Sequence, residues 1–335
     1  MGEITVDMSR IRRLSRAITI SLLFGIPVWL LGTVFGAMFG NSRPVNRRPK
    51  IKYVIFDLGD VLLAESSKEQ VKILGLGKAL KIGLTIGARQ FLPFMKPLNI
   101  RKKKKEIAGK IRPIENPALN ARTQDGSAPL SQIDRDWLSG KYSCKECLEQ
   151  ATQFVENHPE LFSGKTEQKS VETAFRINFT PEHVARILKP VKEGIKFVQE
   201  CKDQGMEVLI LSNMDSQTAD LLQENYPQLF GLFKEENIFI SGDMRMIKPD
   251  PQIFETVLRE RDLDPHACVF FDDQKENVEA ARACGISAVQ CSKKKKLLGG
   301  SKPDIDYLRK QLAALIIERE LEALDEERTT ETVHI

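Results

Sequence analysis

The chain has 335 residues, of which 41% are hydrophobic and 29% are charged, and its formal net charge is +4. This length accommodates a substantial core together with an insert or a second domain, and the composition excludes a largely disordered chain. The six cysteines lack the spacing of a secreted disulfide framework, which favours a reducing compartment. Aromatic residues interleaved with the basic runs are sparse and no recognised binding motif appears, so we expect no nucleic-acid partner.

The N-terminal part contains a long apolar run between two basic segments. Residues 17–40 carry no charge, and at ~1.5 Å per residue they reach ~36 Å, enough to cross a hydrocarbon layer of ~30 Å. We therefore expect a transmembrane helix over 17–40, preceded by a basic tail over 1–16 and followed by a basic linker over 41–50. A cleaved signal peptide is the main alternative, but its apolar region is usually only ~7–15 residues long.

Glycines recur at four-residue spacing within this run, at Gly32, Gly36 and Gly40. They leave one helix face without side chains, where the helix of a second copy has room to approach closely. Homodimerisation through this face is one interpretation. The other is that glycine is simply common in membrane helices.

Beyond the linker, short apolar runs alternate with amphipathic stretches. This alternation predicts an α/β fold, in which a parallel sheet is covered by helices on both faces. The first strand is expected at Ile51–Phe56 and a later one at Met206–Leu211. Helices are expected over 191–204, 276–284 and 304–315, with Gly205 and Gly285 ending the first two, and residues 316–335 are expected to form a polar tail.

Four polar signatures stand at or just past strand-like runs and are widely separated in the sequence. They are Asp57, the pair Ser212 and Asn213, Lys248, and the pair Asp272 and Asp273. In a parallel α/β sheet, residues just past the carboxyl ends of the strands converge on one crevice. The sequence therefore predicts a single site to which all four signatures contribute.

These residue types suit the handling of a phosphate group. A carboxylate nucleophile such as Asp57 can accept a phosphoryl group if positive charge neutralises the crowded oxygens. Asp272 and Asp273 beside it form a like-charge cluster that requires a divalent cation such as Mg²⁺. Neutral donors and a mobile ammonium complete such a site, and the expected phosphate-binding residues are Ser212, Asn213 and Lys248.

The order and flanking residues of these signatures resemble the haloacid dehalogenase-like hydrolase superfamily. The closest resemblance is to its phosphatase branch, whose first motif reads Phe-Asp-Leu-Gly-x-Val and stands here as Phe56 to Val61. It covers a core made of residues 51–64 and 190–315, for which it implies a Rossmann-like sheet. Taken singly each motif has an ordinary alternative, such as a helix start at Asp250 and Pro251, but four in this order are specific.

The resemblance also implies a role for each matching residue. Asp57 is the nucleophile and a ligand of Mg²⁺, and the catalytic group further includes Ser212 and Lys248, which bind the transferred phosphoryl group. Asn277 is expected to support the metal site from the following helix. The implied metal ligands are Asp57, the carbonyl of Gly59, Asp272 and Asp273.

One position departs from the pattern. Many phosphatases of this family carry a second aspartate two residues after the nucleophile, which protonates the leaving group, and this chain has Gly59 there. Asp60 is one residue further on, and a one-residue offset in an extended segment sends a side chain to the opposite face. General acid–base catalysis is worth ~10²–10⁴-fold in rate. The candidates are therefore a phosphatase for good leaving groups such as acyl or anomeric phosphates, a slow phosphatase, a silent relative that binds a ligand, or a dehalogenase.

Residues 65–189 form a long insert, at the place where the resembled family often carries a mostly helical cap over the active site. From Gln70 to Lys105 the insert is basic and apolar without any acidic residue. This segment suits contact with anionic lipid headgroups, and the alternative is an ordinary cap helix whose lysines face water. A second basic run extends from Lys293 to Lys296. It could contact lipid headgroups, face water or steer an anionic substrate toward the site.

Cys144 and Cys147 form an isolated C-x-x-C motif. No second pair stands at the spacing of a zinc site, so ordinary thiols are expected rather than structural zinc.

Taken together, these features predict a membrane-anchored, Mg²⁺-dependent phosphatase acting on a small phosphorylated substrate. A membrane-tethered binding or scaffold protein on a degenerate hydrolase core is one alternative, and a phosphatase for lipid phosphates is another. Basic residues flank both ends of the apolar run almost equally, so the positive-inside rule does not decide the orientation. The thiols and the need for intracellular phosphate substrates favour a single-pass protein whose catalytic domain is cytoplasmic.

Overall fold

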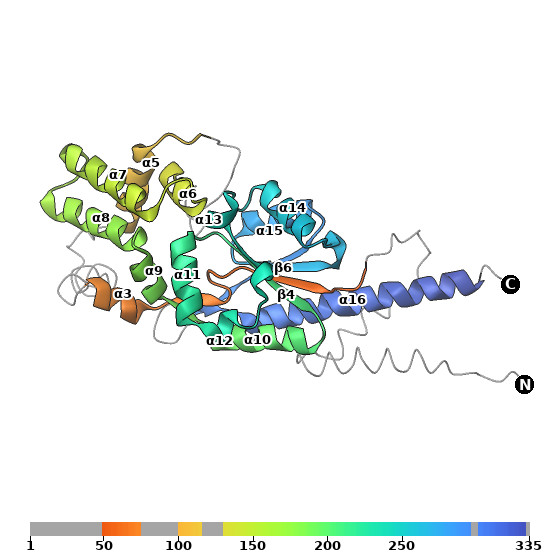
Figure 1. Cartoon of the computed structure of the whole chain (residues 1–335). Coiled ribbons are helices and arrows are strands. Elements are labelled where there is room, and N and C mark those ends of the chain that lie inside the picture. The colour runs from red at the N-terminus through yellow and green to blue at the C-terminus, as the bar shows by residue number, and fades with distance from the viewer. Residues whose placement is uncertain (1–48, 75–99, 116–129, 296–300, 333–335) are drawn as a thin grey trace, which may run out of the picture.

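The computed structural model describes residues 49–74, 100–115, 130–295 and 301–332 (Figure 1). The predicted basic tail, the apolar run over 17–40 with its glycines Gly32, Gly36 and Gly40, and most of the linker lie outside these residues. Within the described ranges, no helix is both long and apolar enough to cross a membrane.

Five parallel strands form the central sheet, in the order β5-β4-β1-β6-β7. Because all five run in the same direction, their carboxyl ends lie at one edge of the sheet, which confirms the predicted parallel α/β core. Ile51 and Met206, predicted to open strands, lie just before them. The strands are β1 (Tyr53–Phe56), β4 (Glu207–Ser212), β5 (Ile238–Ile240), β6 (Cys268–Asp272) and β7 (Ser287–Gln290).

Alternating side chains of the strands form two apolar layers, one on each face of the sheet. Phe56 and Phe271 face one layer, together with Phe197 of α10 (Lys192–Asp203), and the ring centroids of Phe56 and Phe197 are 5.7 Å apart. Ile55 and Phe270 face the other layer. Helices α11 (Ser216–Asn225) and α16 (Ile305–Thr332) add to the first layer, and α14 (Pro251–Glu260) and α15 (Lys275–Ala283) to the second.

Helix α16 is longer than predicted. It was expected to end at Leu315 and to give way to a polar tail, but it continues to Thr332 and extends well past the sheet (Figure 1). Residues 316–332 contain no glycine or proline and include six glutamates, two leucines and two arginines, which favour the helix. The polarity of this stretch therefore does not mark the end of the helix, and Ile317 and Arg319 within it are still buried.

The insert between β1 and α10 folds into a helical cap with its own apolar core around Ile107, Trp137 and Phe175 (Figure 1). It joins the sheet domain through an antiparallel pair of short strands, β2 (Leu63–Glu65) and β3 (Leu188–Pro190). Its described helices are α3 (Ser67–Leu74), α5 (Ile100–Ile111), α6 (Gln132–Leu138), α7 (Cys144–Asn157), α8 (Lys165–Asn178) and α9 (Pro181–Ile187).

Much of the basic segment of the cap, residues 75–99, lies outside the described residues. In α5, the Nζ atoms of Lys103 and Lys104 lie 5.9 Å from the ring centre of Phe162 and 5.5 Å from that of Phe175, respectively. Desolvation lowers the pKa of Lys104 below its usual value. These two lysines therefore pack against aromatic rings of the cap itself.

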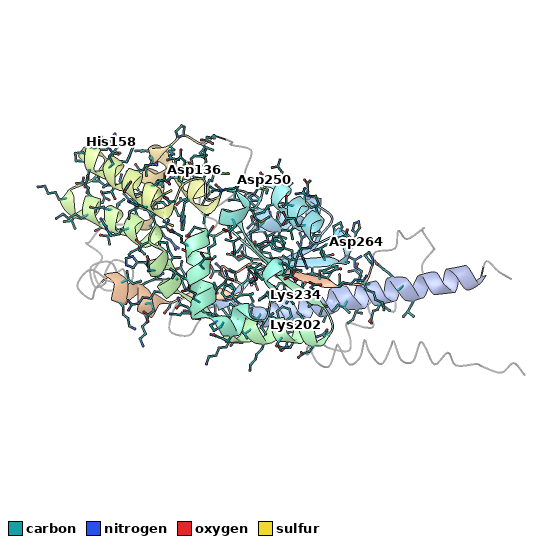
Figure 2. All side chains as sticks on the ribbon, in the orientation of Figure 1. Asp136, His158, Lys202, Lys234, Asp250 and Asp264 are labelled. Atoms are coloured by element: carbon teal, nitrogen blue, oxygen red, sulfur yellow. The ribbon has the colours of Figure 1, made fainter. Side chains whose placement is uncertain are left out.

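The cysteines of the C-x-x-C motif are buried in the cap, and burial raises the pKa of both Cys144 and Cys147 to about 12. Neither belongs to a cluster of three or more potential ligands in the part of the chain that the structure describes. Both cysteines are therefore buried thiols, and the absence of zinc at this motif stays a prediction. Asp136, labelled in Figure 2, lies nearby in α6, where it accepts hydrogen bonds from Gln132 and Arg112.

Candidate active site

The predicted site residues meet at the carboxyl edge of the sheet. Asp57 directly follows β1, and its backbone N–H donates to the carbonyl of Phe271 at 2.9 Å, which locks it beside β6. Ser212 and Asp272 are the last residues of β4 and β6, the two neighbours of β1. Signatures far apart in the sequence are thus brought onto three adjacent strands, as the sequence predicts.

Lys248 is the centre of the site. It is only 1% exposed, and its Nζ donates to Asp57 Oδ1 at 2.8 Å, to Asp272 Oδ2 at 2.7 Å and to the carbonyl oxygen of Leu211 at 2.8 Å. Burial disfavours the charged ammonium, but Asp272 and Asp57 outweigh it and raise the pKa of Lys248. All three donors of the ammonium are thereby used in fixing the nucleophile relative to β4 and β6.

Asn213 positions Lys248. Its Nδ2 donates to the carbonyl oxygen of Lys248 at 2.8 Å, and its Oδ1 accepts from the backbone N–H of Lys248 at 2.8 Å. The side-chain amide is thus engaged with backbone, which gives Asn213 a positioning role that the sequence did not reveal. Its direct contact with phosphate stays a prediction. The side chain of Ser212, at the end of β4, acts to lower the pKa of Asp57 against the larger effect of burial.

Three carboxylates crowd around this lysine. One oxygen from each of Asp57, Asp272 and Asp273 lies within 4.8 Å of the others. Burial, opposed by Lys248, raises the pKa of Asp57 to about 6, and burial together with Asp272 and Asp57 raises the pKa of Asp273 to about 8. The chain alone does not balance this negative charge, and hard oxygen donors of this kind fit Mg²⁺.

The three carboxylates are not equivalent. Asp272 is fully buried, and besides Lys248 it accepts from the backbone N–H of Gln274 at 2.7 Å and from Asn277 Nδ2 at 3.1 and 3.0 Å. Asn277 thus supports the cluster from α15, as predicted. Because the oxygens of Asp272 already accept several protein donors, Asp57 and Asp273 are the carboxylates best suited to direct metal contact.

The turn after the nucleophile contains Gly59 and Asp60. Gly59 forms an isolated bridge with Leu63, and its carbonyl as a metal ligand stays a prediction. Asp60 adopts a left-handed conformation with φ 53°, and its Oδ2 lies 2.8 Å from Lys293 Nζ. Asp60 is therefore held in an ion pair rather than placed as a substitute for the missing aspartate.

Sequence reasoning did not assign Lys293 to the site. Its Nζ also lies 3.3 Å from Asp273 Oδ2, and Lys293 partly opposes the rise in the pKa of Asp273. The basic run beginning at Lys293 was visible in the sequence. Nothing local, however, indicated that its first member faces acidic residues of the motifs, because this pairing arises only in the folded chain.

A family model for haloacid dehalogenase-like hydrolases matches residues 51–285. The chain belongs to this family. The matched region contains four of the five strands of the sheet, the cap and every predicted site residue, so the resemblance of the motifs is confirmed. The family is one of hydrolases, which establishes the coarse class of the protein.

The individual proteins to which the chain is similar share less than a third of their aligned residues with it. The chain is 31% identical over 119 residues to a sesquiterpene phosphatase of Aspergillus oryzae, a match that covers 33% of this chain and 59% of that enzyme. A Bacteroides thetaiotaomicron enzyme of the family, solved with magnesium and inorganic phosphate, is 18% identical with a TM-score of 0.43, covering 74% of this chain and 97% of that one. An L-2-haloacid dehalogenase of Xanthobacter autotrophicus is 15% identical with a TM-score of 0.39, covering 73% and 79%.

Proposed function

We propose that the protein is a Mg²⁺-dependent phosphatase that hydrolyses a phosphate monoester through an aspartyl-phosphate at Asp57. The observation that carries the proposal is the buried contact of 2.8 Å between Asp57 and Lys248 inside a cluster of three carboxylates. A dehalogenase, which attacks carbon, does not need this cluster. A scaffold needs neither the cluster nor the buried lysine.

The chain's own groups account for the two half-reactions. A carboxylate oxygen of Asp57 attacks phosphorus, the ester P–O bond breaks, and the departing oxygen takes up a proton from solvent. Water then attacks the aspartyl-phosphate, releasing inorganic phosphate and the free carboxylate. The positive charge of Lys248 beside Asp57 and the hydroxyl of Ser212 stabilise the negative phosphoryl oxygens during both steps. Asp57 and Asp273 would hold Mg²⁺, which would supply further charge neutralisation there.

Gly59 shapes the choice of substrate. No carboxylate stands two residues after Asp57, and Asp60 is paired with Lys293. The leaving oxygen must therefore depart without the usual acid, whose contribution is ~10²–10⁴-fold in rate. We expect the best substrates to have good leaving groups, such as acyl or anomeric phosphates, and ordinary alkyl phosphates to react slowly.

The test is phosphate release by the purified full-length chain from a panel of phosphate esters, with and without Mg²⁺. Asp57→Asn should lower the rate by at least about 10³-fold, because the amide is a poor nucleophile, while the fold survives. Asp264→Asn is the matched control, since Asp264 caps a short helix before β6, away from the site, and asparagine caps equally well. Activity retained in Asp57→Asn would sink the mechanism, and a folded wild type inactive on every ester would favour a binding protein.

A lipophilic phosphate is a second candidate substrate. The observation that favours it is the 31% identity over 119 residues to a sesquiterpene phosphatase, because a sesquiterpene is an apolar group. The apolar run over 17–40, proposed to anchor a single-pass protein with a cytoplasmic catalytic domain, suits a substrate that partitions into lipid. Comparing a prenyl phosphate with glucose 1-phosphate in the same assay decides between the two, through the ratio of their kcat/KM values.

A further inference from the structure

A second lysine approaches the carboxylate cluster from outside the four signatures. Lys293 opens β8 (Lys293–Lys295), which pairs with β9 (Ser301–Pro303) before α16 begins. Its Nζ lies between two carboxylates, 2.8 Å from Asp60 Oδ2 and 3.3 Å from Asp273 Oδ2. The next residue, Lys294, pairs instead with Asp304 and Asp306, at 2.8 and 3.0 Å. Neighbouring lysines of one basic run thus have separate partners.

The charges around Lys293 determine what it can do. Counting Asp60, four carboxylates face two ammonium groups, Lys248 and Lys293, so the fully ionised site carries an excess of two negative charges. One divalent cation removes that excess. The two lysines differ in freedom, because Lys248 is 1% exposed whereas the side chain of Lys293 is 32% exposed. Only Lys293 has room to shift without disturbing the nucleophile.

We propose that Lys293 is a positioning residue of the metal centre. Without a divalent cation, Lys293 pairs with both Asp273 and Asp60. When the cation binds Asp273, Lys293 remains paired with Asp60 alone. The inference rests on the proposed function, since it requires that Asp273 hold Mg²⁺. Lys293 and Mg²⁺ seek the same carboxylate, and Asp60, the nearer partner of Lys293, provides it with an alternative site. In this arrangement Asp60 holds Lys293 and does not act as an acid.

The proposal predicts opposite effects for two substitutions. Lys293→Met removes a cation that competes with Mg²⁺ while keeping the length of the side chain, so Mg²⁺ should bind roughly three- to tenfold more tightly. Asp60→Asn removes the alternative partner, leaves Lys293 on Asp273, and should weaken Mg²⁺ binding by a similar factor of roughly three to ten. Asparagine tolerates the left-handed conformation of Asp60, so the backbone is preserved.

The experiment is calorimetric titration of Mg²⁺ into the metal-free full-length chain and its variants, supported by the rise in melting temperature with Mg²⁺. Lys293→Arg keeps the charge and should bind Mg²⁺ like the wild type. Lys294→Met is the matched control, because it removes the neighbouring charge without touching Asp60 or Asp273. Unfolding curves in the absence of Mg²⁺ verify that each variant folds.

The outcomes separate this inference from the proposed function. Opposite shifts for Lys293→Met and Asp60→Asn, with Lys294→Met unchanged, support the role of Lys293. Shifts in the same direction, or none, overturn it while leaving a magnesium phosphatase in place. If the folded wild type binds no Mg²⁺, both the inference and the proposed metal dependence fail.

Discussion

At the scale of a single residue, the buried side chain of Lys248 organises the site. Its ammonium donates to two carboxylates and one carbonyl, all at 2.7–2.8 Å, and Asn213 holds its backbone from both sides. Burying an ammonium and two carboxylates is unfavourable unless each is paired and hydrogen-bonded. The arrangement is therefore intelligible as preorganisation for catalysis rather than as a source of stability.

Substitutions of Lys248 test whether its buried charge serves catalysis. Lys248→Met should reduce kcat by ~10²–10³-fold, because the charge facing the phosphoryl oxygens disappears. Lys248→Arg should also fail, since a planar guanidinium cannot reproduce three contacts that converge on one nitrogen. The measurement is kcat with the best ester at saturating Mg²⁺. Lys234→Met, which removes an exposed lysine, is the control. A Lys248→Met variant as fast as this control would place phosphate binding elsewhere.

At the scale of elements, prediction succeeded where periodicity and strand ends carry the information. The apolar run before Asp57 and the one before Asp272 predicted strands of one parallel sheet, because polar residues just past the carboxyl ends of such strands converge on one crevice. Two features could not be predicted. The pairing of Asp60 with Lys293 joins residues far apart in sequence, and the lysines of α5 pack on Phe162 and Phe175, which lie well beyond them in the chain. The continuation of α16 was missed, although the helix propensity of its residues favours it.

The cap also contacts the sheet domain through the turn between α6 and α7. Ser241 Oγ donates to the carbonyl oxygen of Leu138 at 2.6 Å, and Cys144 Sγ donates to Asp215 Oδ1 at 3.3 Å. Arg245 donates to the carbonyl oxygen of Gly140. This second attachment lies on the loop that follows Ser212 and on α13 (Ser241–Met244), so it fixes the cap close to the end of β4.

Gly140 is the tightest point of this attachment. It has φ +64°, and a Cβ there would lie 2.3 Å from the carbonyl oxygen of Gly242. Gly140→Ala should therefore raise KM and lower the melting temperature. Gly205→Ala is the matched control, because Gly205 has φ +80° with nothing within 4 Å. Gly205→Ala introduces the backbone strain of a positive φ, roughly 1–2 kcal/mol, without a steric clash. The difference between the two variants therefore reports the effect of the clash. Equal KM values in the two variants would show that this contact does not position the cap.

At the scale of the whole molecule, the sheet separates the site from the point where the N-terminal segment joins. The strands run in parallel from Lys52, whose N–H donates to the carbonyl oxygen of Ala267 at 2.9 Å, to the edge that holds Asp57. Helix α16 returns in the opposite direction, from Asp304 near the site to Arg319, which donates to Ser287 Oγ at 3.0 Å at the start of β7. Anything attached before residue 49 therefore connects to the edge opposite the site.

This separation predicts that the N-terminal segment and catalysis are independent for a soluble substrate. Deleting residues 1–48 removes the proposed anchor but none of the described groups around Asp57. The truncated chain should therefore keep kcat/KM for a soluble ester within about twofold while losing its attachment to vesicles, because the apolar run supplies the free energy of membrane insertion. With a prenyl phosphate presented in vesicles, the same deletion should lower the rate strongly, since enzyme and substrate no longer share a surface. Equal losses on both substrates would mean that the segment contributes to the site itself.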